Sequence, residues 1–408
     1  MNTGDTAWIL ISSALVLLMT PGLAFFYGGM VRKKNMLSVL MQCFIIMCVL
    51  SLQWVLFGYS LSFHPASGFW GGFGWAGLKG VGLEAYPDYA GTIPHQAFMI
   101  FQAMFAIITP ALIIGAFAER MKFSAFLVFT LLWATFVYDP LCHWVWGIGG
   151  WLRNLGALDF AGGTVVHINA GIAALVTALV IGRRKNLDTN TPVPHNLPFV
   201  VLGTGLLWFG WFGFNAGSAL AANGLAVNAF VVTNTAAAAA GLSWALLEWK
   251  RNGKPTMFGV ASGAVAGLVA ITPAAGFVSV IPAIIIGSLV SVFCFIAVSA
   301  IKPKFGYDDS LDAFGVHCVG GIWGALATGL FASKAVNPLG ADGLFFGNPK
   351  QFLIQLATVL VTIGYTFIAT FLIYKLVDLF IGVRVSEKEE LMGLDLTQHR
   401  ERAYTVLE

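Results

Sequence analysis

Charged residues are scarce in this chain of 408 residues, in which Asp, Glu, Lys and Arg together make up only 10%. A water-soluble protein of this length needs far more polar residues to cover its surface. Hydrophobic residues make up 58%, and the mean hydropathy is +0.82. Apolar runs of about 20 residues, enough to cross the hydrocarbon core of a bilayer, recur along the chain. They are too long and continuous for barrel strands, so we predict an all-α polytopic membrane protein.

Motifs of nucleotide-driven pumps and enzymes are missing as well. The chain has no G-x-x-x-x-G-K-[ST] motif, no H-E-x-x-H motif and no row of arginines typical of a voltage sensor. No basic residue precedes Arg32, so we expect a retained first helix and not a cleaved signal. The cysteines lack metal-type spacing and are expected to be free, buried thiols: Cys43, Cys48, Cys142, Cys294 and Cys318. We therefore predict no enzyme activity, no metal site, no cofactor and no nucleic-acid partner.

The apolar runs predict eleven transmembrane helices. Their approximate extents are 8–30, 37–60, 95–118, 124–146, 162–182, 197–219, 225–249, 257–275, 278–301, 312–333 and 351–381. Of the 22 Lys and Arg residues, 18 fall on alternate connections, near the last helix end, or in the tail. Cytoplasmic loops carry such an excess, so we place the N-terminus outside and the C-terminus in the cytoplasm.

Two similar stretches stand out in this apolar background. V-H-I-N-A-G-I begins at Val166 in the fifth predicted span, and V-H-C-V-G-G-I begins at Val316 in the tenth. Five spans per half is an odd number, so the second half must cross the membrane in the opposite sense to the first. This pattern predicts a 5+5 inverted-topology repeat with its site near the bilayer midplane. The expected halves are 8–182 and 197–333, followed by a long C-terminal helix, 351–381, within a transmembrane domain of residues 1–382.

His167 and His317 are the leading candidates for function. Ionisable groups inside membrane helices usually face the bundle interior or a cavity, where they pair with one another. If the repeat brings the two rings together, they can share one hydrogen bond. A buried histidine can also have a purely structural role, with its ring hydrogen-bonded to a backbone carbonyl. Two histidines in matching positions instead favour a pair of neutral imidazoles that line a narrow passage and offer polar groups without a fixed charge.

Aromatic residues suggest a cation site beside these histidines. Phe101 and Phe105 share one face of the third span, and Trp146 ends the fourth. Trp211, Phe214 and Ser218 share a face of the sixth. Ring faces attract a small cation and a hydroxyl accepts its hydrogen bond, although an aromatic belt at the membrane surface explains the same pattern. Asp159 and Asp312, before the two histidines, are expected to cap helices, with an electrostatic role open for Asp159.

Five segments resemble the ammonium transporter (Amt/Mep/Rh) family, and specifically its bacterial Amt branch. They are PGLAFFYGG (21–29), GAFAERMKFSAF (115–126), LDFAGGTVVHINAGIAAL (158–175), GWFGFNAGSA (210–219) and DAFGVHCVGGIWG (312–324). The resemblance extends over essentially the whole chain, including the GLDLTQHRERAY segment (393–404) of the tail.

The resemblance implies a homotrimer in the cell (inner) membrane, with one pore in each protomer. By motif it assigns ammonium recruitment to Phe105, Trp146 and Ser218, with Trp211 nearby, and a gate to Phe101 and Phe214. It assigns the pore to His167 and His317 and a supporting role to Asp159. The polar tail, residues 383–408, would be cytoplasmic and regulatory, and a PII-type (GlnK-like) protein would dock there.

The free-energy cost of moving ammonium into an apolar pore predicts how such a protein works. Moving an intact ammonium ion into hydrocarbon costs tens of kcal/mol, whereas a dry cation–π contact contributes about 2 kcal/mol. We therefore expect ammonium to lose a proton at the bottom of the outer site, and ammonia to pass the histidines. The alternatives are an ammonium sensor acting through its tail, and a neutral gas channel of the Rh type.

Overall fold

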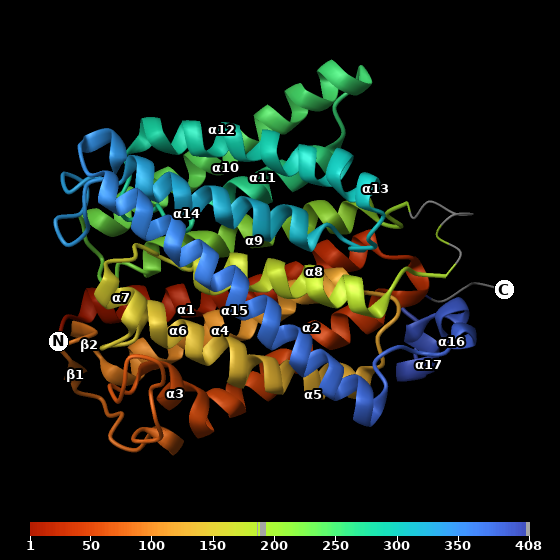
Figure 1. Ribbon diagram of the computed structural model, residues 1–408, viewed down its shortest axis with the longest axis horizontal. Coiled ribbons are helices and arrows are strands. Elements are labelled where there is room, and N and C mark those ends of the chain that lie inside the picture. The colour runs from red at the N-terminus through yellow and green to blue at the C-terminus, as the bar shows by residue number, and fades with distance from the viewer. Residues whose placement is uncertain (186, 188–192, 405–408) are drawn as a thin grey trace.

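The computed structural model describes residues 1–185, 187 and 193–404, and it is mostly helical. Long helices run side by side along one axis, and the first residues and the tail, residues 383–404, lie at opposite ends of the bundle (Figure 1). We refer to these ends as the N-terminal and C-terminal ends. Within the described part of the chain, ten helical segments are long and apolar enough to cross a membrane.

The first half contains five such segments. They are α1 (Thr3–Met30); α2 (Met36–Gln53) continued by α3 (Tyr59–Phe63); α4 (His95–Phe117); α5 (Phe123–Trp133) continued by α6 (Asp139–Trp146); and α8 (Asn169–Ile181). Short π-helical segments, Trp54–Gly58, Ala134–Tyr138 and Gly163–Ile168, join or begin three of them. A two-stranded ribbon, β1 (Ala85–Tyr86) and β2 (Ala90–Pro94), and a short helix, α7 (Trp151–Leu155), lie at the N-terminal end.

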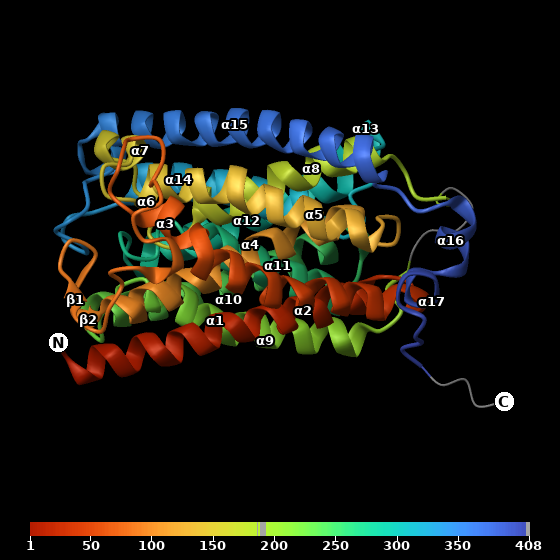
Figure 2. The same ribbon diagram turned by 90° about the horizontal axis from the view of Figure 1, so that it is seen from below.

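The second half contains α9 (Leu197–Gly217), α10 (Gly224–Asn252), α11 (Met257–Ile271), α12 (Val280–Ile296) with α13 (Lys302–Phe305), and α14 (Val319–Phe331). π-helical segments Ala297–Ile301 and Phe314–Cys318 lie within the last two spans. The long helix α15 (Pro349–Ile381) then covers one face of the bundle (Figure 2). Helix α11 has 15 residues, or about 22 Å at 1.5 Å per residue, which is short for a bilayer core. An eleventh span over 257–275 therefore stays a prediction.

Helix ends follow local sequence signals. The side chains of Asn2, Asn196, Asn223 and Thr256 accept backbone N–H groups at the starts of α1, α9, α10 and α11. Between these ends the apolar runs continue unbroken, and helices satisfy every backbone group internally, as a lipid environment requires. Helix α6 ends at Trp146, as the sequence predicts.

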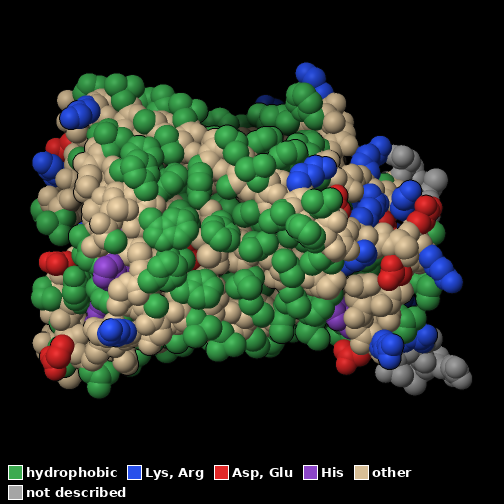
Figure 3. Space-filling model, turned by 60° about the horizontal axis from the view of Figure 1, so that its bottom comes forward, with side chains coloured by type: hydrophobic (Ala, Val, Ile, Leu, Met, Phe, Trp, Pro, Cys, Tyr) green, Lys and Arg blue, Asp and Glu red, His purple; other side chains and the backbone are tan. Residues whose placement is uncertain are grey.

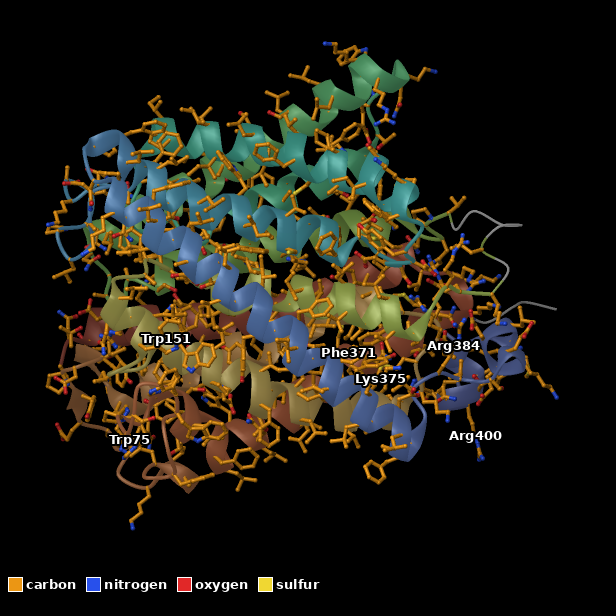
Figure 4. All side chains as sticks on the ribbon, viewed as in Figure 1. Trp75, Trp151, Phe371, Lys375, Arg384 and Arg400 are labelled. Carbon is orange, nitrogen blue, oxygen red and sulfur yellow. The ribbon has the colours of Figure 1, made fainter. Side chains whose placement is uncertain are left out.

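The types of residue on the outer surface differ between the middle and the ends of the bundle. Hydrophobic side chains cover the middle, while Lys, Arg, Asp and Glu gather at the two ends, most densely at the C-terminal end (Figure 3). Trp75 and Trp151 lie near the N-terminal end, and Arg384 and Arg400 at the C-terminal end (Figure 4). An exposed apolar band of this kind is expected where lipid replaces water. Four cysteines are buried, but Cys48 on α2 is exposed, so the prediction of a buried thiol is wrong there.

The tail does not stay apart from the bundle. It forms α16 (Glu387–Met392) and α17 (Leu394–His399), which pack against the connections at the C-terminal end. Asp395 accepts the Ser38 N–H at 2.8 Å, and the Leu394 N–H donates to Asn35 Oδ1 at 2.8 Å. The final residues, 405–408, lie outside the described part of the chain.

Candidate functional site

The two candidate histidines lie together in the middle of the bundle. The ring centroids of His167 and His317 are 5.4 Å apart with 16° between the ring planes, so the rings are close and nearly parallel. Both side chains are buried, with 1% and 3% exposure. The shared hydrogen bond that we expected does not form, because both ring nitrogens of His167 have no partner. The two nitrogens of His167 therefore remain available to a ligand.

The glycines of the V-H-x-x-x-G-I motif explain how the rings approach. A Cβ atom on Gly171 would lie 2.3 Å from the Cys318 backbone nitrogen, and one on Gly321 would lie 3.0 Å from the Gly163 carbonyl oxygen. Each motif therefore provides the small residue that lets its helix cross the other at close range. Both histidines also lie in π-helical segments, which are often found at functional sites.

A series of cavities passes through the bundle beside these rings. At the N-terminal end a vestibule of about 250 Å³ is lined by Phe105, Trp146, Asp159 and Ser218, among others. Two enclosed cavities of about 10 and 20 Å³ follow, and His317 lines both. A cavity of about 700 Å³ lies at the C-terminal end and shares Leu311 and Asp312 with the second enclosed cavity. A water molecule needs about 10–15 Å³, so each enclosed cavity has room for about one small neutral molecule.

Phe105 and Phe214 separate the vestibule from the first enclosed cavity. Their ring centroids are 4.3 Å apart, Phe105 lines the vestibule, and Phe214 lines the cavity. Phe101, which we expected to form the gate with Phe214, lies 5.0 Å from Phe105 and is completely buried. The close ring partner of Phe214 at this boundary is thus Phe105.

Trp211 lies deeper than the sequence suggested. It lines the first enclosed cavity, stacks on His167 with centroids 5.4 Å apart, and donates its indole N–H to Thr272 Oγ1 at 2.8 Å. Trp146 and Ser218, in contrast, line the vestibule. The Ser218 hydroxyl donates to the Phe214 carbonyl at 2.9 Å, which leaves the oxygen lone pairs available as acceptors.

Asp159 organises the wall between the vestibule and His167. Its carboxylate accepts the backbone N–H groups of Gly162, Gly163, Thr164 and Val165 at 2.6–3.2 Å, and also the Thr164 hydroxyl. Its backbone carbonyl accepts the Trp146 indole N–H at 2.8 Å. A carboxylate at a helix start is stabilised by the unpaired N–H groups there. Asp159 therefore connects the segment that carries His167 to the vestibule tryptophan.

Comparison with known proteins identifies the family. The model of the Ammonium Transporter Family matches residues 7–404. The chain belongs to the ammonium transporter family. The ammonium transporter of Bacillus subtilis is 56% identical over 404 residues, which cover 99% of both chains. The crystal structure of Candida albicans Mep2 is 40% identical with a TM-score of 0.90, covering 99% of this chain and 90% of that one.

A more distant relative carries a different description. The solved structure of a sensor Amt protein is 29% identical with a TM-score of 0.89, covering 97% of this chain and 98% of that one. The family and the apolar helices together make this chain a multi-pass membrane protein. Its curated relatives are described as transporters, in agreement with a protein that is not an enzyme.

The structure brings out one acidic residue, Asp309, that the sequence patterns did not single out. Asp309 precedes His317 by eight residues, as Asp159 precedes His167. Asp309 accepts the Phe314 N–H at 2.8 Å, at the start of the segment that carries His317. Asp312, which we expected to cap this helix, instead pairs with Lys302 at 2.6 Å and has a positive φ of 61°. Equal spacing to the two histidines was the signal that could have identified Asp309.

The neighbouring acid, Asp308, belongs to an ion-pair network at the C-terminal end. Arg184 contacts Asp308 at 2.9 Å and Glu119 at 3.1 Å, and Arg32 contacts Glu119 at 2.8 Å. Burial alone would raise the pKa of Asp308, but hydrogen bonds from Arg184 and the charge of Arg120 lower it to about 2. A further ion pair lies in the tail, where Arg384 contacts Glu390 at 2.9 Å.

The contrast between Asp308 and Asp309 gives a pH-dependent prediction. Burial raises the pKa of Asp309 to about 6, above the value of about 4 for an unfolded aspartate. The folded state therefore binds this proton more tightly, and its contribution to stability falls as pH rises from about 4 to 6. We expect Asp309→Asn to stabilise the protein at pH 7.5, by up to about 3 kcal/mol, but not at pH 4.5. Thermal unfolding in detergent at both pH values measures the difference.

Asp308→Asn is the matched control for this experiment. Its carboxylate is ionised at both pH values, so its loss removes the Arg184 pair and destabilises the protein at pH 4.5 and at pH 7.5. An equal shift in unfolding temperature for Asp309→Asn at the two pH values would contradict the raised pKa of Asp309.

Proposed function

We propose that this chain transports ammonium by capturing the ion in the N-terminal vestibule, removing a proton, and conducting ammonia along the histidine-lined cavities. The observation that carries the proposal is the order and size of the cavities along the bundle. Two spaces of about one small molecule each, both lined by His317, lie between two much larger vestibules. Spaces of this size exclude a hydrated ion but accept a single ammonia molecule.

Capture relies on the aromatic rings and the serine hydroxyl of the vestibule. Phe105 and Trp146 meet edge to face with centroids 5.8 Å apart, and ring faces attract a cation. Ser218 offers lone pairs to an ammonium N–H, because its own hydrogen is donated to a carbonyl. Asp159 supports this site through its bond to Trp146 and is already saturated by five hydrogen bonds, so it acts without binding the ion.

We infer that ammonium loses a proton because the aromatic contacts cannot offset the cost of desolvating its charge. A cation–π contact contributes about 2 kcal/mol or somewhat more when dry, against tens of kcal/mol to desolvate a charge. Desolvation lowers the pKa of an amine cation by up to about 3–5 units, which brings proton loss within reach at neutral pH. Ammonia then passes Phe105 and Phe214, and the partnerless nitrogens of His167 offer it a donor and an acceptor. Potassium has no proton to lose and is rejected.

The eleven-span topology, with the N-terminus outside and the C-terminus cytoplasmic, forms part of this proposal. The excess of Lys and Arg at the C-terminal end supports the orientation. Matching π-helical segments support a 5+5 inverted repeat: Gly163–Ile168 corresponds to Phe314–Cys318, and Ala134–Tyr138 corresponds to Ala297–Ile301. The homotrimer in the cell (inner) membrane, nitrogen uptake, the regulatory tail of 383–408 and the PII-type partner rest on the family resemblance.

Current from purified protein in liposomes tests the function. We expect the released proton to cross separately along the imidazoles of His167 and His317. An ammonium pulse should therefore produce a transient current on a supported membrane, and an equal potassium pulse should not. The second candidate is a sensor, favoured by the fold shared with the sensor Amt protein. A sensor that does not transport would give neither current nor uptake of labelled methylammonium. Uptake without current would identify neutral conduction of the Rh type.

The vestibule residues give a further prediction. Ser218→Ala removes one acceptor and Trp146→Leu removes one ring face, contacts worth about 1–2 kcal/mol each. We expect the ammonium concentration at half-maximal current to rise about five- to thirtyfold, while the unfolding temperature stays within a few degrees. Trp75→Leu, at the N-terminal end but outside the vestibule lining, is the control. Unchanged half-saturation in both vestibule variants would place capture elsewhere.

A further inference from the structure

A buried acid and a buried histidine in α6 have no part in the transport path proposed above. Asp139 and His143 are both 0% exposed and lie one helical turn apart. Side chains four residues apart are neighbours on a helix surface. Ionisable groups inside a membrane-spanning segment are costly and are usually functional. His143 also lies three residues before Trp146, which lines the vestibule.

Both ring nitrogens of His143 face carbonyl oxygens. Nδ1 lies 3.0 Å from the Ser62 carbonyl oxygen, and Nε2 lies 2.6 Å from that of Ser67. A carbonyl oxygen can only accept a hydrogen bond. A neutral imidazole carries a hydrogen on one nitrogen only, so two such contacts require the imidazolium form.

The other histidines do not share this arrangement, and all of them lie in the described part of the chain. The two ring nitrogens of His195 face the Val31 carbonyl and the Tyr404 hydroxyl, which can donate, so a neutral ring suffices. His95 faces the Tyr59 hydroxyl, and His64 faces one carbonyl, that of Gly71. His143 is thus distinguished by its acceptors and not merely by its burial.

Asp139 has the surroundings of an ionised carboxylate. Gln53 donates its amide N–H to Asp139 at 2.7 Å, and the Ser62 hydroxyl lies 3.3 Å from the other oxygen. The Gln53 amide oxygen, in contrast, is buried without a partner. A carboxyl group that accepts from both an amide N–H and a hydroxyl has the contacts expected of the ionised form, which only accepts. Ser62 links the two charges, because its hydroxyl faces Asp139 and its carbonyl faces His143.

We propose that Asp139 and His143 form a buried, ionised pair that positions Trp146 for ammonium capture, which deepens the function proposed above. The imidazolium holds the Ser62 and Ser67 carbonyls against α6, close to the helix end that carries Trp146. Gly147 fits this junction closely: its N–H donates to the His143 carbonyl at 2.9 Å, and a Cβ there would lie 2.5 Å from His143 Nδ1. The indole is thereby held where it can reach the Asp159 carbonyl and Phe105.

Other titratable groups around the pair do not replace Asp139 as the counter-charge. Tyr138 ends the π-helical segment just before α6 and Cys142 lies within α6, and both are completely buried. Across the junction, the Tyr89 hydroxyl donates to the Phe63 carbonyl and accepts the Ile148 N–H. Arg153 donates to the Trp146 carbonyl at 2.8 Å from the exposed side. Among the described residues, Asp139 is the acid nearest in sequence on the same helix face, so its charge balances that of His143 locally.

Solid-state NMR of the intact protein in bilayers tests the charge directly. Cys142–His143 is the only Cys–His dipeptide in the chain, so carbonyl-labelled cysteine with ¹⁵N-histidine assigns His143 without any substitution. We expect both ring nitrogens of His143 to carry hydrogen at pH 7.5. A ring with one unprotonated nitrogen would overturn the proposal, whatever the protein transports.

Transport by variants tests the positioning role. In His143→Gln and in Asp139→Asn, we expect the ammonium concentration at half-maximal current to rise about tenfold while the maximal current changes less than twofold. The double variant should be no worse than either single variant, because the pair acts as a unit. His64→Gln is the control, since His64 contacts one carbonyl of the same loop and should stay close to wild type.

The outcomes separate the two proposals. Unchanged half-saturation in both variants, or additive losses in the double variant, would overturn the positioning role. Absence of current in the unmodified protein would overturn the proposed function but leave the NMR result standing as a property of the fold.

Discussion

Replacing His167 and His317 together by leucine is expected to abolish the ammonium-driven current, lowering it at least about a hundredfold. His167 lines the first enclosed cavity and His317 lines both, and the ring nitrogens of His167 have no partner in the structure. Leucine is close in size but offers no donor or acceptor, so ammonia would cross the cavities without a hydrogen bond. An unpaired polar group in an apolar environment costs several kcal/mol, and 1.4 kcal/mol is a tenfold change in rate.

A control variant that replaces two histidines outside the enclosed cavities shows whether the loss of current depends on the position of the imidazoles. His64 and His399 lie outside the lining of the two enclosed cavities, and His64→Leu with His399→Leu should retain most of the current. Both double variants are compared in liposomes at equal protein density after the same ammonium and potassium pulses. Undiminished and equally selective current from the His167→Leu, His317→Leu protein would overturn the proposed conduction path.

Asp159→Ala is expected to have the second largest effect, with loss of nearly all transport and of several kcal/mol of folding stability. The substitution leaves four backbone N–H groups and the Thr164 hydroxyl without their acceptor, and each buried unpaired group costs about 1–3 kcal/mol. The segment that carries His167 begins at these groups, so the ring loses its support. Thermal unfolding and liposome current together measure the two losses.

Two comparisons sharpen this test. Asp159→Asn keeps one acceptor oxygen and the side-chain shape, so it should recover part of the stability but not the full current. Asp342→Ala removes a carboxylate that accepts one exposed backbone N–H, from Lys334 at 2.8 Å, and should change the unfolding temperature little. Wild-type unfolding temperature and wild-type current in Asp159→Ala would show that the segment does not depend on this carboxylate.

Local features of the chain were predictable because their cause is local. The expected span 95–118 is observed as His95–Phe117, and the expected span 162–182 as Gly163–Ile181. Length of apolar sequence sets these limits, since every residue of such a run must satisfy its backbone groups within the same helix. The helix Met257–Ile271 ends before the expected limit at residue 275, because the chain forms turns from Thr272 onward, next to Pro273.

The site itself was only partly predictable. Equal motifs around His167 and His317 indicated that the two rings belong together, and they do lie 5.4 Å apart. That they share no hydrogen bond, that Trp211 packs on His167, and that Phe105 meets Phe214 all depend on how separate helices are rotated against one another. Periodicity within one helix does not report this rotation, which is set by the residues that touch at each crossing.

By itself, then, the sequence determined that this chain is a helical membrane protein, which family it resembles, and which two histidines lie together. Each of these properties depends on a continuous run of residues or on a short motif. Only the tertiary structure decided that Asp309 and not Asp312 starts the second histidine segment, and that two carbonyls from another segment face His143. Those contacts join residues far apart in the chain or choose between acids three positions apart, and close packing alone selects between them.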